Sequence, residues 1–70
     1  MIATVGDLVY YKGEGQEPPC FGVVSSIKNK YMAIVTWAFP DRDGEVTSEI
    51  DIDEVYAGEN YNLTVMKKKV

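Results

Sequence analysis

The 70-residue chain is predicted to be a single small all-β domain, and three features of the sequence indicate this. Apolar residues occur in short runs that are rich in β-branched and aromatic side chains. Gly, Pro, Asn and Asp separate these runs, as they do in turns between strands. No window repeats apolar residues with helical spacing over three turns, so no amphipathic helix is expected. A chain of this length holds one domain, residues 1–70.

Five runs of residues are expected to form the strands: 7–11, 21–28, 31–39, 45–50 and 61–66. The third run is the longest and most apolar, which favours a place at the centre of the sheet. Pro18 and Pro19 donate no backbone hydrogen bonds, so they must lie off the sheet or at its edge. Asn29 and Lys30 are expected to form a tight hairpin turn, because Asn tolerates the positive φ that such turns require.

The fourth run alternates in polarity, which is typical of a half-buried strand. Val46, Ser48 and Ile50 are expected to share its inner face. The preceding turn, residues 40–44, contains Pro and Gly at positions that suit a chain reversal.

The segment before the last run is expected to form a single 3₁₀ turn. Residues 51–55 are too few for a stable helix, and the turn would dock Ile52 and Val55 on the core. In the last run, Leu63 and Val65 are expected to face inward.

Both faces of the third run are apolar, although a small barrel buries only one face completely. Side-chain alternation separates Ala33, Val35 and Trp37 from Met32, Ile34 and Thr36. The second apolar face indicates either a covering segment, for which Pro18, Pro19 and Tyr56 are candidates, or an interface with another protein.

Charge is unevenly distributed along the chain. The formal net charge is −4, and eight of the eleven acidic residues lie within residues 41–59, together with one base, Arg42. Polyanion binding is therefore disfavoured over most of the domain, because each phosphate contact needs a cation. Lys67, Lys68 and Lys69 form a basic tail, which indicates either a solvated end or electrostatic contacts with phosphates or with an acidic patch.

The residue types present argue against catalysis, cofactors and metal binding. The chain has no histidine to act as a general base, and Cys20, its only cysteine, is expected to be a small buried hydrophobe. An internal disulfide and a Cys/His zinc site are excluded. The pairs Asp41/Asp43 and Asp51/Asp53 occur in turns, where Asp commonly bonds to its own backbone. We therefore expect a non-enzymatic protein without cofactor or metal.

Neither a signal peptide nor a membrane span is expected. The first residues contain no basic segment, and no apolar run approaches about 20 residues. The sequence thus predicts a protein of the cytoplasm or of a virion that is not secreted by a signal peptide.

The order of elements resembles an SH3-like barrel with the layout of KOW and Tudor domains. Four segments carry the resemblance: Gly6-Asp7-Leu8-Val9, Gly22-Val23-Val24, Val35-Thr36-Trp37 and the acidic turn at residues 51–55. The layout is also similar to that of short accessory proteins of tailed bacteriophages. This resemblance implies a five-stranded SH3-like barrel with a 3₁₀ turn before the last strand.

Two functions are compatible with that architecture. We favour a protein–protein interaction module, such as a small structural or decorating subunit of a phage particle, acting within a larger assembly or a homo-oligomer. The alternative is a KOW-type nucleic-acid or transcription-associated module, or an acidic mimic of DNA. The residues expected to bind the partner are aromatic or proline: Tyr10, Tyr11, Pro18, Pro19, Trp37, Phe39 and Tyr56.

Overall fold

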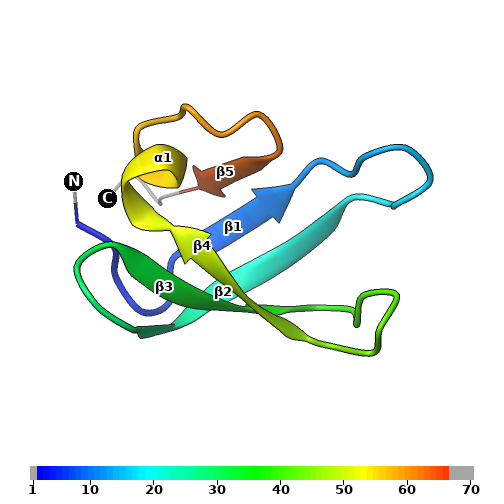
Figure 1. The fold of residues 1–70 in the computed structure, drawn as a ribbon, viewed down its shortest axis with the longest axis horizontal. Coiled ribbons are helices and arrows are strands. Elements are labelled where there is room, and N and C mark those ends of the chain that lie inside the picture. Colours follow the sequence, from blue (N-terminus) through cyan, green and yellow to red (C-terminus); the bar gives the residue numbers. More distant parts are fainter. Residues whose placement is uncertain (1, 67–70) are drawn as a thin grey trace.

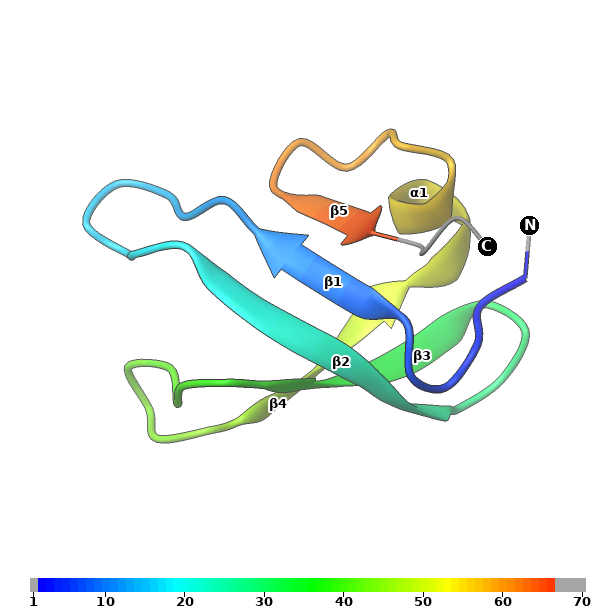
Figure 2. The same cartoon turned by 180° about the vertical axis from the view of Figure 1, so that it is seen from behind.

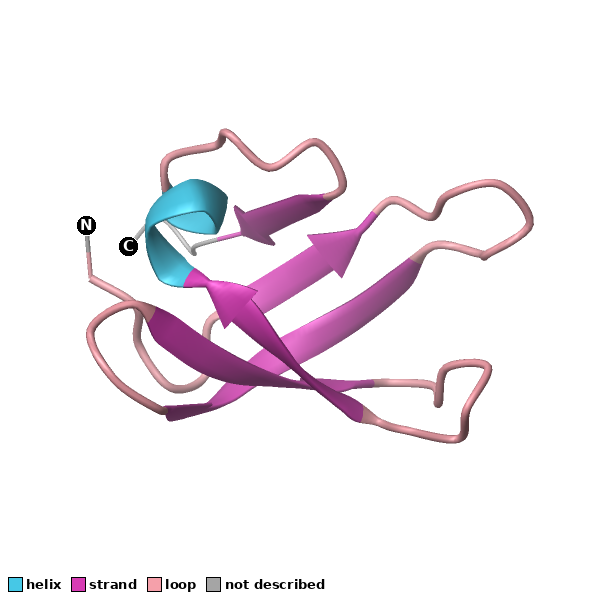
Figure 3. Ribbon diagram, viewed as in Figure 1, coloured by secondary structure: helices cyan, strands magenta, loops and turns pink. Residues whose placement is uncertain are grey.

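The computed structural model describes residues 2–66 as five antiparallel strands and one short helix (Figures 1 and 3). The strands are β1 (Leu8–Tyr11), β2 (Cys20–Ile27), β3 (Met32–Trp37), β4 (Thr47–Asp51) and β5 (Leu63–Met66). They form one sheet in the order β4-β3-β2-β1-β5. The sheet curls into a half-barrel, as the two opposite views show (Figures 1 and 2). The prediction of an all-β domain with five strands is confirmed.

The centre of the sheet is β2 and not the third run of the sequence. β2 pairs with β1 on one side and with β3 on the other. At eight residues it is also the longest strand. The placement of the third run at the centre was wrong, because its apolar character comes from burial on one face and partial cover on the other rather than from a central position.

The core lies on the concave face of the curled sheet. β1 and β2 each contribute a fully buried valine, Val9 and Val24, and one of the two apolar faces of β3 supplies Ala33 and Val35. Trp37, Leu63 and Val65 are partly buried and pack against this cluster, which agrees with the inward direction predicted for Leu63 and Val65. The buried residues are Val9, Val24, Ala33, Val35, Ile50, Ile52 and Val55.

A five-residue α-helix, α1 (Ile52–Tyr56), replaces the expected 3₁₀ turn. Asp51 caps it by accepting a hydrogen bond from the Glu54 N–H at 3.0 Å, and the Ala57 N–H bonds to the Asp53 carbonyl at 3.0 Å. The cap and this bond between residues four apart stabilise a single α-helical turn that length alone argued against. α1 packs against β4 and β5 and, as predicted, docks Ile52 and Val55 on the core.

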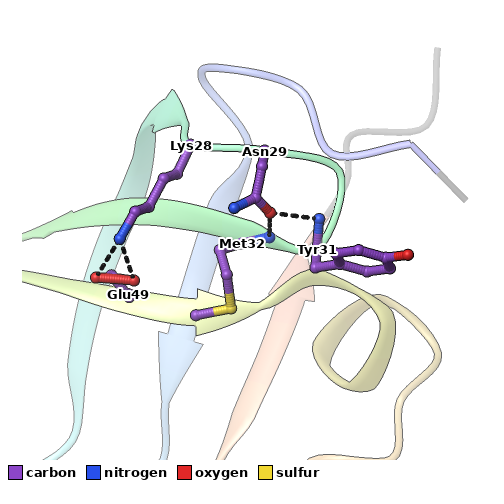
Figure 4. Close-up of polar contacts among 5 residues, drawn as sticks. All are labelled: Lys28, Asn29, Tyr31, Met32 and Glu49. Carbon is purple, nitrogen blue, oxygen red and sulfur yellow. Dashed lines mark hydrogen bonds and ion pairs between the residues drawn. The ribbon is translucent and has the colours of Figure 1, made fainter.

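The turn between β2 and β3 is built differently from the predicted hairpin. No residue other than glycine has a positive φ in the part of the chain that the structure describes. Instead, the Asn29 side-chain oxygen accepts hydrogen bonds from the backbone N–H groups of Tyr31 and Met32, at 2.8 and 3.0 Å (Figure 4). Asn29 thus stabilises the turn through its side chain and not through a left-handed backbone.

β4 is an edge strand that buries less than its alternating pattern predicted. Ile50 is buried, but Val46 and Ser48 are exposed. Ile50 lies opposite Ala33 at the core, whereas Ser48 and Val46 lie progressively nearer the end of the sheet that bears the 38–46 turn. The core does not extend to that end, so the inward side chains there meet solvent.

β4 and β5 are the two edges of the sheet, and within residues 2–66 no ladder joins them. α1 lies at one end of the opening between them (Figure 1). The loops 12–19 and 38–46 project at the opposite end of the molecule (Figures 1 and 2). No helix in the described part of the chain has the length and apolar character to cross a membrane.

Candidate binding groove

A groove with a volume of about 660 Å³ lies at the end of the sheet opposite α1. Loop 12–19 and the segment 60–63 form one wall, and β4 with the 38–46 turn forms the other. The groove therefore follows the open side of the half-barrel, between its two edge strands. Five of the seven residues predicted to bind a partner line it: Tyr11, Pro18, Pro19, Trp37 and Phe39.

Aromatic rings form the apolar surface of the groove. Tyr11 and Trp37 meet edge to face, with ring centroids 6.3 Å apart and an angle of 68° between the planes. Such a pair adds to the stability of an apolar cluster beyond the area that it buries. Phe39 is 71% exposed, so its ring is available to a ligand without rearrangement.

Trp37 is held in place from two sides. Its indole Nε1 donates a hydrogen bond to Ser48 Oγ at 2.8 Å, which ties β3 to the neighbouring strand β4. On β2, Gly22 lies directly opposite Trp37 in the ladder. A Cβ at position 22 would lie 2.6 Å from the indole Cε3 and 2.6 Å from Val35 Cγ1. The absence of a side chain at Gly22 therefore makes room for the tryptophan.

Loop 12–19 is tied to the aromatic cluster by Tyr11 and Glu17. The Tyr11 hydroxyl donates a hydrogen bond to Glu17 Oε1 at 2.9 Å. This hydrogen bond to a carboxylate, with a smaller contribution from burial, raises the pKa of the Tyr11 phenol. Gly13 has φ +87°, and a Cβ there would lie 2.6 Å from the Glu17 carbonyl oxygen, so only glycine fits this tight return. The prolines that follow lie off the sheet, as predicted.

The rim of the groove is predominantly acidic. Among the described residues that line it are four carboxylates and one cation, Arg42. The carboxylates are Glu17, Asp41, Glu45 and Glu49. Lys28 partly balances Glu49, because its Nζ lies 3.1 Å from both carboxylate oxygens (Figure 4). The pair is exposed on both sides and contributes little to stability. The groove thus combines an apolar surface with negative charge.

Two residues predicted to bind the partner lie elsewhere. Tyr10 is on the convex face of the sheet, where its ring packs against Phe21 at a centroid distance of 5.0 Å. Side chains alternate along β1, so Tyr10 and Tyr11 face opposite ways. Tyr56 packs against the core and donates a hydrogen bond to the Asp7 carboxylate. Burial, then this hydrogen bond, raises the pKa of the Tyr56 phenol far above its ordinary value. Tyr56 is a structural residue.

Among residues 2–66, none of the candidate covering residues lies over the convex face. Pro18 and Pro19 line the groove and Tyr56 packs against the core, so none of these candidates covers it. Phe21 and Val23 remain 47% and 39% exposed there.

Among residues 2–66, no group of three or more Cys, Asp or Glu side chains is arranged to hold a metal ion. Asp41 Oδ1 accepts hydrogen bonds from the Asp43 and Glu45 N–H groups, at 2.8 and 2.9 Å, and so stabilises the 38–46 turn. Cys20 is half-buried at the edge of the groove, which corrects the expectation that it is buried, because β2 begins at this residue and its end is open. Lys67, Lys68 and Lys69 lie outside the described residues.

Sequence reasoning missed the polar residues of the groove. Glu17, Ser48 and Glu49 were not singled out, although they position the aromatic rings or charge the rim. Nothing in the sequence around these residues marked them as part of a site, because a side chain's neighbour across a sheet depends on register, which the sequence pattern did not specify.

Comparisons of this chain with protein-family models, with curated proteins and with solved structures found no match. The functional argument therefore depends on the geometry and chemistry of the groove.

Proposed function

We propose that the chain is a non-enzymatic protein-binding module that holds a segment of a partner protein in the groove. The observation that carries this proposal is the convergence of Tyr11, Trp37 and Phe39 with two prolines on one open, acid-rimmed surface. Exposed aromatic residues in a concave setting supply most of the binding energy in many protein interfaces. Their aromatic rings also lose little conformational entropy on binding.

The charge of the rim determines which class of partner fits. Four carboxylates against one guanidinium favour a segment that carries lysine or arginine beside apolar side chains. The same charges repel the phosphates of RNA or DNA, which require cations on the protein. The groove therefore supports the protein-binding interpretation over the nucleic-acid alternative.

The proposal includes the finer interpretations from the sequence. The chain is an SH3-like module whose barrel is open between β4 and β5, and its partner belongs to a larger assembly such as a phage particle. The order of strands and the short helix before β5 support the first interpretation. The second depends on the resemblance of the sequence layout alone.

A titration followed by the fluorescence of Trp37 tests the proposal, because Trp37 is the only tryptophan and lines the groove. The probe is a capped octapeptide of alternating valine and lysine. Its control has glutamate in place of lysine. We expect a saturable change in emission with the lysine peptide and none with the glutamate peptide. No change with the lysine peptide, together with salt-sensitive binding of a single-stranded oligonucleotide, would overturn the proposal in favour of the nucleic-acid module.

Two matched variants locate the binding surface while keeping the reporter. Phe39→Ala removes an exposed ring from the groove, and Phe21→Ala removes an exposed ring from the convex face. We expect the first to weaken peptide binding about tenfold, as for a moderate hot-spot residue, and the second to leave it unchanged. The opposite order would assign binding to the convex face.

A further inference from the structure

Two backbone hydrogen bonds at the ends of β4 show which of its residues are hydrogen-bonded to β3. The Trp37 N–H donates to the Val46 carbonyl at 2.6 Å, and the Ile52 N–H donates to the Tyr31 carbonyl at 2.8 Å. In an antiparallel ladder, hydrogen-bonded and non-hydrogen-bonded pairs alternate. The register therefore makes the pairs containing Ser48 and Ile50 hydrogen-bonded.

The backbone groups of Thr47 and Glu49 consequently face away from β3. They lie in the non-hydrogen-bonded pairs with Thr36 and Ile34, so their N–H and C=O groups point to the open edge of the sheet. β4 has no neighbour on that side among residues 2–66. Both residues also line the groove. Along the groove, the N–H and C=O groups of Thr47 and Glu49 are therefore spaced as they would be for pairing with a further β-strand.

We infer that the partner segment binds as an added antiparallel β-strand along β4, pairing its backbone with Thr47 and Glu49. This inference rests on the proposed function and specifies how the groove holds its ligand. Strand addition gives affinity through main-chain hydrogen bonds and selectivity through the side chains that enter adjoining pockets. The length of β4, five residues, accommodates such a segment.

The direction of the side chains on β4 specifies the composition of the segment. Ser48 and Ile50 face the groove side, whereas Thr47 and Glu49 face outward. A residue placed opposite Ser48 therefore points toward Trp37 and should be apolar. The neighbours on either side lie opposite Thr47 and Glu49. A basic side chain opposite Glu49 pairs with its carboxylate, and one opposite Thr47 has Glu45 and Glu49 as its diagonal neighbours. The ligand is an extended segment in which apolar and basic residues alternate.

Charge argues against a second copy of the chain as the added strand. Residues 45–51, which contain β4, carry Glu45, Glu49 and Asp51 and no base. Pairing two β4 edges would bring these carboxylates together, and acidic edge strands of this kind resist self-association. A basic partner strand removes the repulsion.

β5, the other edge, is less suited to strand addition. The Leu63 N–H, which faces away from β1, already donates a hydrogen bond to the Asn60 side chain at 2.9 Å. The Lys12 N–H donates a hydrogen bond to the Asn62 carbonyl. Because hydrogen-bonded and non-hydrogen-bonded pairs alternate along the β1–β5 ladder, the backbone groups of Leu63 face away from β1. α1 also packs against β5. The observations therefore favour β4 as the acceptor of the strand.

Backbone methylation of the octapeptide tests the inference. In one peptide the backbone nitrogens of the lysines are methylated, and in the other those of the valines. The two have identical side chains and equal numbers of methyl groups. The lysines lie opposite Thr47 and Glu49, so methylation of their nitrogens removes the donors that face β4 and adds bulk there. We expect that peptide to bind about tenfold more weakly or worse, and the valine-methylated peptide to bind within about threefold of the parent.

The possible outcomes separate the two proposals. If both methylated peptides bind as the parent does, or both weaken equally, strand addition is wrong while binding in the groove stands. If the parent peptide itself does not bind, the proposed function fails. Hydrogen exchange gives an independent readout, because binding should slow exchange at the Thr47 and Glu49 amides and leave the Ser48 amide unchanged. Unchanged exchange at Thr47 and Glu49 in the complex would also overturn the inference.

Discussion

Replacement of Gly22 by Ala is predicted to destabilise the domain and to displace Trp37. The added Cβ would lie 2.6 Å from both Trp37 and Val35 and 3.0 Å from the Thr36 carbonyl. Val35 is fully buried and the Thr36 carbonyl belongs to the adjacent strand, so neither moves without disturbing the sheet. Overpacking of this kind costs about 1–3 kcal/mol, and contacts this short favour the upper end of that range.

The effect of the substitution on backbone entropy stabilises the folded state, but it is smaller than the cost of overpacking. Alanine in a strand is favoured over glycine by about 0.5–1 kcal/mol because less entropy is lost on folding. The net loss of unfolding free energy at Gly22 is therefore about 2 kcal/mol. For a domain of this size, each kcal/mol lowers the melting temperature by roughly 4–8 °C.

Urea unfolding followed by circular dichroism measures the loss of stability, and Trp37 emission in the folded state reports displacement of the indole. Gly44→Ala is the control. Gly44 has φ +83° and open space around it, so its substitution costs about 1 kcal/mol in backbone strain without touching Trp37. A Gly22→Ala protein with wild-type stability and emission would refute the packing argument.

Three further substitutions test local contacts. Asp51→Ala should cost about 1 kcal/mol of unfolding free energy because α1 loses its cap, and Asp51→Asn should restore most of it. Asn29→Ala should lower the free energy of unfolding by about 1 kcal/mol, because the turn loses the two hydrogen bonds that the Asn29 side chain accepts. Asn29→Asp keeps an acceptor at this position, so equal stability of the two variants would contradict this argument. The raised pKa of Tyr56 means that the folded state keeps the phenol proton at a pH where the unfolded chain releases it. The contribution of the Tyr56 phenol to the free energy of unfolding is complete below about pH 10 and declines as the pH rises further. Tyr56→Phe should therefore make the free energy of unfolding less dependent on pH above about pH 10.

The sequence predicted the strands well because each depends on local patterns of polarity. Alternation placed Ala33 and Val35 on one face of their strand, which the structure buries, and predicted that Leu63 and Val65 face inward. Turn residues marked the ends of the strands to within a few positions. The position of each strand within the sheet depends on pairing between distant segments, and the placement of the third run at the centre was wrong for that reason.

The short helix and the Asn29 turn show a second limit. In both places a polar side chain bonds to nearby backbone, and this decides the local conformation. Asp51 stabilises an α-helical turn where chain length suggested 3₁₀, and Asn29 replaces a left-handed residue with side-chain hydrogen bonds. Asp and Asn have several such options, and residue type alone does not choose between them.

The sequence named the aromatic residues that line the candidate groove, but it predicted neither their convergence nor the polar residues beside them. Tyr11, Trp37 and Phe39 converge because β1 and β3 flank β2, an arrangement that composition does not specify. Tyr10 was included only because it is aromatic, and the alternation along β1 places it on the other face. Which backbone groups of β4 face the open edge depends on its pairing with β3, and no feature of the sequence indicated it.

The most direct test of the account is a map of amide chemical shifts by NMR during titration with the alternating valine–lysine peptide. Binding in the groove along β4 predicts shifts that cluster at Tyr11, Trp37, Thr47 and Glu49 and leave Phe21 unchanged. Shifts centred on Phe21 and the convex face, or no shifts at saturating peptide, would contradict the assignment of the groove as the binding surface.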